Sequence, residues 1–542
     1  MMLKPANGLP QTSAKSKLVL EQATASLQAG DRGDAERLLR KHILAEPKDA
    51  SVLAKLAELA MDVGHVEEAT VLLRRAVGAC STPNMRLTLI RHLQHFVGAQ
   101  QTIEEIESLP PDLRDSFDVL SIEAAVRGFL REHGRQIEIY EQIGRRDPGN
   151  SALWKTLGDA LKTVGRTDEA VAALRRAIKV RPNYGEAYWT LANFKSFKFT
   201  DHDISAMRKA LRGKLSDEDA LHFHFALGEA YEARKQYAKS FHHYEAGNAI
   251  RRKGIPPESL RVTDFVQRAK AVLSPELFQH YKGAGAKGED PIFVLGLHRS
   301  GSTLIEQILA SHPLIEGTAE LTVMQQIWDR ISRIGALHGR GPFHELIHLD
   351  HSEIRKLGEE YLERTRAYRS TDRPYFVDKL PANWMNLGLI RLILPNAKII
   401  DSRRHPMACG FSNFKQNYAS GVTFSYSLES VGHFYRDYVT FMDHIDQVQP
   451  GAVHRVINEQ LIEDTEGEVR RMLGYIGVPY DPACLDFHKT KRAVQTPSAE
   501  QVRRPINREG IGRWKHYEPW LGPLKAALGP ALEQWNAPVG SR

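Results

Sequence analysis

Residues 291–312 read PIFVLGLHRSGSTLIEQILASH and decide the fold of the second half of the chain. The apolar run at 291–297 is typical of a buried parallel strand. A polar stretch with a glycine follows at 298–303, and apolar residues then recur at helical spacing from Leu304 to Leu309. The order of strand, tight loop and helix predicts a site for an anion. The backbone N–H groups of the loop and the N-terminus of the helix would both point towards the bound anion.

The spacing of this loop matches the nucleotide-binding pattern G-x-x-x-x-G-K-[ST] with one exception. Gly296, Gly301 and Thr303 keep the glycines and the hydroxyl, but Ser302 stands where the lysine should be. An enzyme acting on nucleoside triphosphates needs that lysine and Mg²⁺ to manage the charge. A loop that carries Arg299 instead suits transfer of a sulfuryl group, which needs no metal. A degenerate triphosphate loop or a plain glycine-rich turn stays open as the alternative.

The first half of the chain repeats with a period of 34 residues, as at Gly30, Gly64 and Gly98. Small residues in each unit would let two antiparallel helices approach closely, and large residues would fill the space between neighbouring hairpins. A proline would stop the second helix. The clearest unit consists of Trp154, Leu157, Gly158, Leu161, Gly165, Ala170, Leu174, Ala177 and Pro182.

This unit resembles the tetratricopeptide repeat at every signature position. We predict about six helical hairpins over 16–253, forming an α-solenoid scaffold whose concave face binds a peptide or a protein partner. The unit at 227–250 repeats the pattern, whereas 83–133 is degenerate.

Composition limits the class of protein. The chain has 542 residues, of which 42% are hydrophobic and 26% charged, so it is globular and too long for one core. A net charge of +7 suits an anionic ligand without indicating nucleic acid. We expect neither a membrane-spanning segment nor a secretory signal. Cys80, Cys409 and Cys484 are scattered, which argues against a disulfide framework and favours the cytoplasm.

Shifts in composition predict four parts. Residues 1–15 form a disordered tail and 16–253 form the repeats. Residues 254–289 are rich in proline and glycine and form a linker. Residues 290–542 form an α/β domain with a phosphate-binding loop and a parallel sheet.

Two motifs, RSGSTLIEQILASHP at 299–313 and IEGTAEL at 315–321, resemble the sulfotransferases that use 3′-phosphoadenylyl sulfate (PAPS). The resemblance covers roughly 290–525. It points to tyrosylprotein sulfotransferases and to bacterial proteins that place tetratricopeptide repeats before such a domain. His298 departs from the family, whose members usually carry proline there. The resemblance implies that the 5′-phosphosulfate of PAPS is bound by Arg299, Ser300, Gly301, Ser302 and Thr303.

The resemblance also implies a catalytic set of Glu320, Lys379 and Arg299. Glu320 matches the general base, because an acceptor hydroxyl must lose its proton as the sulfuryl group arrives. Glu316 is a second candidate for the base, and a glutamate that only balances a helix dipole is the alternative. Lys379 matches a lysine that stabilises charge on the leaving oxygen. A surface ion pair of Lys379 with Asp378 is the alternative there.

A second phosphate site is implied at Arg404 and Ser412, which keep the family's eight-residue spacing for the 3′-phosphate. Arg404 lies in a predicted strand and turn at 396–406, and Ser412 lies in the short helix expected after it. Arg403 is a weaker candidate for the same role. Asp401 could mimic a Mg²⁺-binding aspartate, but the two arginines after it argue against a metal.

The basic stretch at 496–520 resembles the family's nucleotide-closing segment, although a solvated basic tail is the alternative. Ser498 matches a family serine near the phosphates, and Arg513 stands in place of a basic nucleotide contact. Asn458, in a predicted strand at 452–464, replaces a tyrosine of the tyrosylprotein sulfotransferases.

His344, Glu345 and His348 fit the zinc motif H-E-x-x-H. A third ligand is missing at the expected spacing, and we predict no metal.

Together these residues predict a sulfotransferase that moves a sulfuryl group from PAPS to an acceptor hydroxyl. The family suggests peptidyl tyrosine, but related domains act on sugars, lipids and small phenols. The repeats would present the acceptor or bind a protein partner. A phosphate-loop ATPase or kinase and a non-catalytic repeat scaffold are the alternatives.

Overall fold

The computed structural model divides the chain into two compact units, Met1–Pro182 and Asn183–Arg542. The division falls inside the segment predicted to form repeats, so the last predicted hairpins belong to the second unit. The four-part division drawn from the sequence stays a prediction. The described residues are 13–28, 31–62, 66–80, 99–130, 132–194, 196–256, 262–418, 421–490, 501–508 and 510–536.

The first unit is helical throughout its described residues. The three glycines that revealed the 34-residue period, Gly30, Gly64 and Gly98, lie outside those residues. Its helices are α1 (Ala14–Gln28), α2 (Arg32–Ala45), α3 (Ala50–Asp62), α4 (Val66–Ala79), α6 (Ala99–Glu107), α7 (Pro111–Arg114), α8 (Phe117–Phe129), α9 (His133–Arg146), α10 (Ser151–Val164) and α11 (Thr167–Val180).

Helices α10 and α11 form the hairpin predicted between Trp154 and Pro182. A Cβ on Gly158 would lie 2.7 Å from Leu174 Cγ, so a larger residue would force the two helices apart. Trp154 lies against the preceding helix, where a Cβ on Gly144 would be 2.9 Å from the indole ring. The small residues of the repeat therefore allow the close approach of paired helices, and the large residues fill the space between neighbouring hairpins, as the pattern predicts.

The second unit begins with four more helices, of which α14 and α15 form an antiparallel pair. The segment 254–289, predicted as a linker, contains two helices in its described residues. One of them, α16, packs on α24, where Thr263 Oγ1 donates to Asp437 Oδ2 at 2.7 Å. These helices are α12 (Gly185–Ala192), α13 (Asp201–Leu211), α14 (Asp217–Ala233), α15 (Tyr237–Arg252), α16 (Thr263–Val272) and α17 (Pro275–His280).

A five-stranded parallel sheet forms the centre of the second unit, in the order β2-β3-β1-β4-β5. The predicted strand at 452–464 is shorter than expected, because α25 begins at Asn458. The strands are β1 (Pro291–Gly296), β2 (Ile315–Gly317), β3 (Tyr375–Lys379), β4 (Lys398–Arg403) and β5 (Val453–Ile457).

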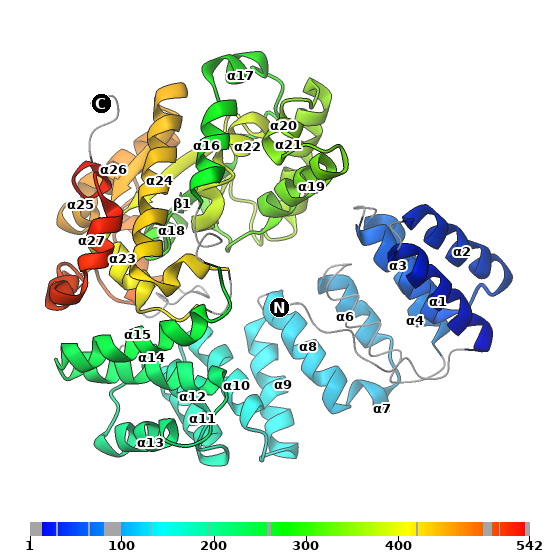
Figure 1. The fold of residues 1–542 in the computed structure, drawn as a ribbon, viewed down its shortest axis with the longest axis horizontal. Coiled ribbons are helices and arrows are strands. Elements are labelled where there is room, and N and C mark those ends of the chain that lie inside the picture. The colour runs from blue at the N-terminus through cyan, green and yellow to red at the C-terminus, as the bar shows by residue number, and fades with distance from the viewer. Residues whose placement is uncertain are drawn as a thin grey trace. The chain divides into compact units, whose positions relative to one another are not determined.

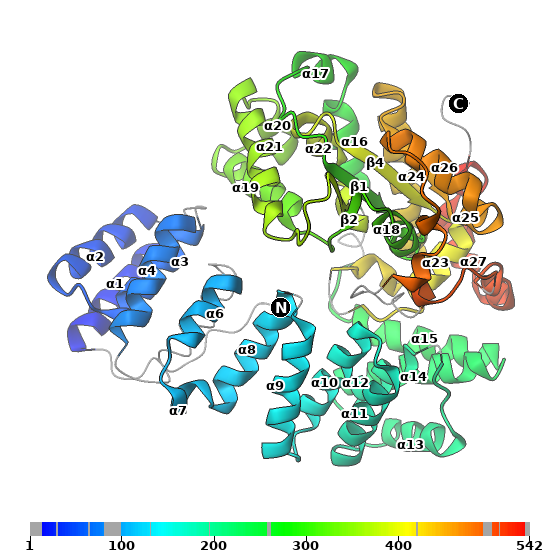
Figure 2. The same ribbon diagram turned by 180° about the vertical axis from the view of Figure 1, so that it is seen from behind.

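Helices cover both faces of this sheet. Ile292 and Val294 pack with α18 and α26 on one face. Phe293 points to the other face, where its ring lies 5.5 Å from that of Tyr361 in α21. Successive side chains of a strand point to opposite faces, so the uninterrupted apolar run of β1 is what burial on both faces requires. In Figure 1 the face covered by α24 is turned to the viewer, and Figure 2 shows the face covered by α18.

The remaining helices connect and flank the strands. Among the described helices, none combines the length and the apolar character needed to cross a lipid bilayer. The helices are α18 (Ser302–Ala310), α19 (Val323–Leu337), α20 (Pro342–Leu346), α21 (His351–Arg366), α22 (Leu387–Ile393), α23 (Pro406–Phe414), α24 (Leu428–Val448), α25 (Asn458–Glu463), α26 (Thr465–Ile476), α27 (Gly522–Leu528) and α28 (Ala531–Gln534), with 3₁₀ helices η2 (Pro381–Trp384), η3 (Thr423–Tyr426), η4 (Pro482–Cys484), η5 (Phe487–Lys489), η6 (Gln501–Arg503) and η7 (Arg513–Trp520).

The strand order determines where a ligand can bind. After β1 the chain adds β2 and β3 on one side of it, and β4 and β5 on the other. Parallel sheets of this kind bind ligands outside the carboxyl ends of the strands, at the point where the order reverses. The loops that follow β1 and β4 meet at that point, and they carry the predicted phosphate-binding residues.

Candidate active site

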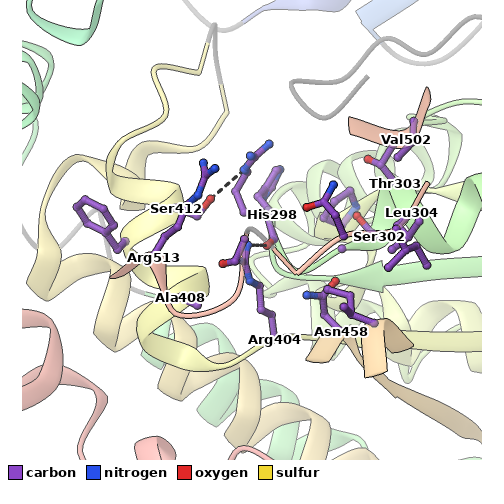
Figure 3. Close-up of a pocket in the computed structure, with 18 of the residues that line it drawn as sticks. His298, Ser302, Thr303, Leu304, Arg404, Ala408, Ser412, Asn458, Val502 and Arg513 are labelled. Atoms are coloured by element: carbon purple, nitrogen blue, oxygen red, sulfur yellow. Dashed lines mark hydrogen bonds between the residues drawn. The ribbon is translucent and has the colours of Figure 1, made fainter. Parts of the chain in front are cut away.

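A single cavity of about 230 Å³ gathers most of the predicted site residues at the carboxyl ends of the strands. Figure 3 shows Ser412 and Arg513 on one side of it and Thr303, Leu304 and Val502 on the other, with Arg404 and Asn458 at the base. The predicted residues that line the cavity are Arg299, Gly301, Ser302, Thr303, Glu320, Arg404, Ser412 and Arg513. Ser498 lies outside the described residues.

The loop after β1 has the geometry of an anion site. Gly301 has φ +107°, and the next two residues, Ser302 and Thr303, open helix α18 and line the cavity. The first amide N–H groups of a helix have no carbonyl partner within it, so they can donate to an anion there. A Cβ on Gly301 would lie 2.4 Å from Asn458 Oδ1, which shows that Asn458 lies directly over the loop.

Arg299 lies within this loop and has an unusual backbone conformation. Its φ of +66° is in the left-handed region, which costs a residue with a Cβ about 1–2 kcal/mol. Its Nε donates to Ser412 Oγ at 3.1 Å, which links the loop to α23. The contact joins the two predicted phosphate sites directly.

Ser300, by contrast, points away from the cavity. Its hydroxyl is buried and donates to Ser402 Oγ in β4 at 3.0 Å, so its role is to fix the loop to the neighbouring strand.

Arg404, a residue of the predicted second phosphate site, contacts the loop after β1. It donates to the backbone oxygens of Arg299 at 3.2 Å and Gly510 at 2.9 Å. Its Nε is buried without a hydrogen-bond partner among the described residues. Burial lowers the pKa of the Arg404 guanidinium, and the neighbouring charges of Arg299 and Arg513 act in the same direction. A guanidinium with an unused donor among like charges is suited to an anion of high charge.

Lys379 and Glu320 form the second half of the site. Lys379 ends β3 and is almost fully buried, with 2% of its side chain exposed, so the surface pair with Asp378 does not exist. Its Nζ donates to Glu320 Oε1 and lies 3.8 Å from Glu306 Oε2. Glu320 is 44% exposed and lines the cavity. The ion pair therefore holds one carboxylate at the cavity wall with a cation behind it.

Glu316, the competing candidate for the base, faces elsewhere. It is 4% exposed, lies in β2, and accepts hydrogen bonds at 2.7 to 3.3 Å from the backbone and hydroxyl groups of Ser370 and Thr371. Burial alone would raise the pKa of Glu316, but these hydrogen bonds outweigh it and hold the pKa below its usual value. The geometry therefore favours Glu320 as the residue that can meet a substrate.

Asp401 and Arg403 are structural. Both are fully buried, and Arg403 Nε lies 2.9 Å from Asp401 Oδ2. Tyr438 donates to the same carboxylate, and Arg403 also donates to the backbone oxygen of Trp535 at 2.7 Å. This arrangement leaves Asp401 no access to a metal in the cavity.

His298 is partly buried and lines the cavity. Burial, with the charges of Lys379 and Arg299 nearby, lowers the pKa of His298 to about 4, so its ring is neutral at physiological pH. Its backbone oxygen accepts from Asn413 Nδ2 at 2.8 Å, which fixes the loop to α23.

The residues of the zinc motif span the end of a short helix. His344 lies in the short helix α20, and His348 lies beyond its end. Glu345 is buried and contacts His338 at 3.1 Å instead. Among the described residues, no group of three or more His, Cys, Asp or Glu side chains could hold a metal.

Sequence reasoning missed two charged residues of the cavity. Lys415 lies one helical turn beyond Ser412, and Glu232 comes from α14, within the predicted repeats. The basic residue near Ser412 could have been noticed. Glu232 gave no signal, because it lies in a segment interpreted as scaffold.

Comparison with known proteins finds two families that match parts of the chain. Residues 291–482 match the sulfotransferase family, and residues 137–193 match the tetratricopeptide repeat. Over 536 residues the chain is 27% identical to an uncharacterized protein of Aquifex aeolicus (strain VF5), which covers 94% of this chain and 69% of that protein. Over 246 residues it is 24% identical to a protein-tyrosine sulfotransferase of Danio rerio, which covers 41% of this chain and 65% of that protein.

A solved structure, the sulfotransferase domain of an olefin synthase from Synechococcus PCC 7002, is 20% identical with a TM-score of 0.28, and the match covers 43% of this chain and 96% of that chain. Residues 291–482 are thus similar to the sulfotransferase family, and residues 137–193, before them in the chain, are similar to the tetratricopeptide repeat.

Proposed function

We propose that the protein transfers a sulfuryl group from PAPS to an acceptor hydroxyl. The observation that carries the proposal is that the residues predicted for two phosphate sites line one cavity with Glu320, whose carboxylate accepts from the buried Lys379 Nζ. PAPS has phosphate groups at both ends of its ribose and a sulfuryl group beyond the 5′-phosphate. Two separate anion sites beside a carboxylate fit that molecule better than they fit a triphosphate with Mg²⁺.

Each end of the donor has its own set of residues. Arg299, Ser302 and Thr303 would hold the 5′-phosphosulfate at the start of α18. Arg404, Ser412 and Arg513 would hold the 3′-phosphate, and the unused Arg404 Nε is available for it. An apolar wall suits the flat adenine base, and it consists of Leu304, Ile462, Phe487, Val502 and Ile506.

The chemistry requires one proton transfer and one displacement at sulfur. Glu320 would accept the proton of the acceptor hydroxyl while the oxygen of that hydroxyl attacks the sulfur of PAPS. The bond from sulfur to the bridging phosphate oxygen breaks, and adenosine 3′,5′-bisphosphate (PAP) leaves. Lys379 Nζ is buried beside Glu320, where it would orient that carboxylate and stabilise the charge that grows on the bridging oxygen.

The acceptor side is also part of the proposal. A second cavity of about 400 Å³ adjoins the first, and Glu232 and Arg513 line both. Aromatic residues from the predicted repeats form its wall, and they are Phe194, Phe197, Phe199 and Tyr237. We propose that the repeats present the acceptor here, and a tyrosine peptide is the first acceptor to test. The cytoplasmic location expected from the cysteine content stays a prediction.

Calorimetry with PAP in the presence of EDTA tests the donor. We expect PAP to bind without metal and ATP with Mg²⁺ to bind more weakly. Equal binding of the two, or none of PAP, would mean that the site is not a PAPS site. Incubation with sulfur-labelled PAPS and candidate peptides, sugars and phenols then identifies the acceptor.

A further inference from the structure

The last predicted repeat hairpin, α14 and α15, packs directly on the helix that carries Ser412. Asn248 Nδ2 in α15 donates to the backbone oxygen of Phe414, the last residue of α23, at 2.7 Å. The ring of Phe241 stacks on those of Phe414 and Trp520, with centroids 5.9 and 5.6 Å away. The hairpin therefore holds the end of α23 and the end of η7 together.

A buried ionic cluster strengthens this contact. Lys415, which follows α23, has its Nζ 2.7 Å from Glu232 Oε2 and 3.1 Å from Glu229 Oε1. These three side chains are 15%, 13% and 19% exposed, respectively. Burial lowers the pKa of Lys415, but the two carboxylates outweigh it and hold the pKa above its usual value. The lysine is therefore charged, and its charge is already matched by residues of the hairpin.

Glu232 also holds the opposite wall of the cavity. Tyr517 in η7 donates its hydroxyl to Glu232 Oε2 at 3.0 Å, and the same hydroxyl lies 2.9 Å from Ser240 Oγ. Thus one carboxylate contacts η7 and the residue that follows α23, and these two elements carry two of the three predicted 3′-phosphate residues, Ser412 and Arg513. Ser412 lies three residues before Lys415, and Arg513 lies four residues before Tyr517.

We infer that Glu232 is a positioning residue for the 3′-phosphate subsite. A lysine paired with two carboxylates is a poor ligand for a phosphate, so the cluster acts through geometry. The cluster sets the separation of α23 and η7. It thereby sets the distance between Ser412 and Arg513, the two residues that would contact the ligand from these elements. The last repeat hairpin is thus a wall of the donor pocket as well as part of a scaffold. This inference rests on the proposed function, because the subsite is defined by PAP.

The test compares two ligands on the full chain by calorimetry. PAP carries the 3′-phosphate and adenosine 5′-phosphate lacks it, so the ratio of their dissociation constants isolates the subsite. Glu232→Gln should lower PAP affinity about tenfold, as for a weakened charge-assisted contact, and change adenosine 5′-phosphate affinity less than about twofold. Tyr517→Phe removes only a hydroxyl. It should shift the ratio of the two dissociation constants in the same direction as Glu232→Gln, but by a smaller factor.

Asp217→Asn is the matched control. Asp217 lies on the same helix, α14, but its ion pair with Lys253 at 3.0 Å is exposed and contacts neither α23 nor η7. It should leave both affinities unchanged. Thermal unfolding of each variant establishes that it is folded at the temperature of the measurement.

The outcomes separate the inference from the proposed function. A wild-type protein that binds PAP no more tightly than adenosine 5′-phosphate would contradict the proposed function itself. A wild-type protein that prefers PAP, with folded Glu232→Gln and Tyr517→Phe variants that keep the same ratio, would overturn the inference. An equal loss for both ligands would also overturn it, since that result indicates general loosening.

Discussion

Replacing Glu320 by glutamine tests the chemistry of the site most directly. The amide keeps the shape of the side chain and an oxygen that can accept from Lys379 Nζ, but it cannot take the proton of the acceptor. Loss of a general base costs about 10²–10⁴-fold in rate, or about 3–5 kcal/mol of barrier. Lys379 would keep Glu306 at 3.8 Å as a counter-charge, so we expect the buried ammonium to remain in place.

Binding of the donor should be nearly unaffected by Glu320→Gln, because the predicted phosphate contacts come from other residues. Calorimetry with PAP should therefore give a dissociation constant within about threefold of the wild-type value, a difference of under 1 kcal/mol. Turnover is measured with sulfur-labelled PAPS and the acceptor that the wild-type protein labels. A variant that lost PAP binding as well would show that Glu320 supports the pocket rather than the proton transfer.

Glu316→Gln is the matched control, four residues earlier in the chain. Its carboxylate is buried and bonded to Ser370 and Thr371, so the change should cost about 1–3 kcal/mol of stability and leave turnover of the folded protein unchanged. The pKa of Glu316 is lower in the folded protein than in the unfolded chain. The ionised carboxylate therefore stabilises the folded protein at pH values above the unfolded pKa, and this stabilisation is lost as the pH falls through the folded pKa. Near-normal turnover of Glu320→Gln together with an inactive but folded Glu316→Gln would refute the assignment.

Three further predictions follow from the structure. Gly301→Ala should weaken PAP binding at least about fivefold, because φ is +107° and the new Cβ would meet Asn458 Oδ1, and calorimetry measures this loss. Burial raises the pKa of Asp378 to about 7 in the folded protein. The contribution of the protonated Asp378 carboxyl group to the stability of the folded protein is therefore complete below about pH 4, and it is lost as the pH rises through 7. Asp378→Asn should therefore flatten the fall in urea stability between pH 4 and 7. Deleting residues 1–182 should spare PAP binding but raise the KM for a macromolecular acceptor. Deleting residues 1–255 should in addition abolish the preference for PAP over adenosine 5′-phosphate, because this deletion removes Glu232 and uncovers Phe414. Calorimetry, acceptor titration and light scattering of the two truncations distinguish these results.

The sequence alone determined the architecture and most of the predicted site residues that line the cavity. The hairpin between Trp154 and Pro182 and the strand, loop and helix of 291–312 are local patterns, because their periodicity and their glycines lie within a few turns of chain. The order of strands, loops and arginines also follows from short motifs. For this reason the loop residues and the Arg404–Ser412 spacing can be predicted from the sequence alone.

Only the tertiary structure separated Glu320 from Glu316. The two residues share one short motif, and only the packing of β2 against the Ser370–Thr371 turn shows which carboxylate is occupied and which reaches the cavity. The same holds for Ser300, which lies within the loop motif and yet points at Ser402.

The contact between Glu232 and Lys415 is the clearest case of a feature that sequence patterns could not reveal. They are 183 residues apart and come from segments interpreted as a scaffold and as a catalytic domain. Periodicity reports which face of a helix is buried, but it carries no information about which distant element covers that face. The contact between the repeat hairpin and α23 exists only because long-range packing brings two buried charges of opposite sign to one wall of the cavity.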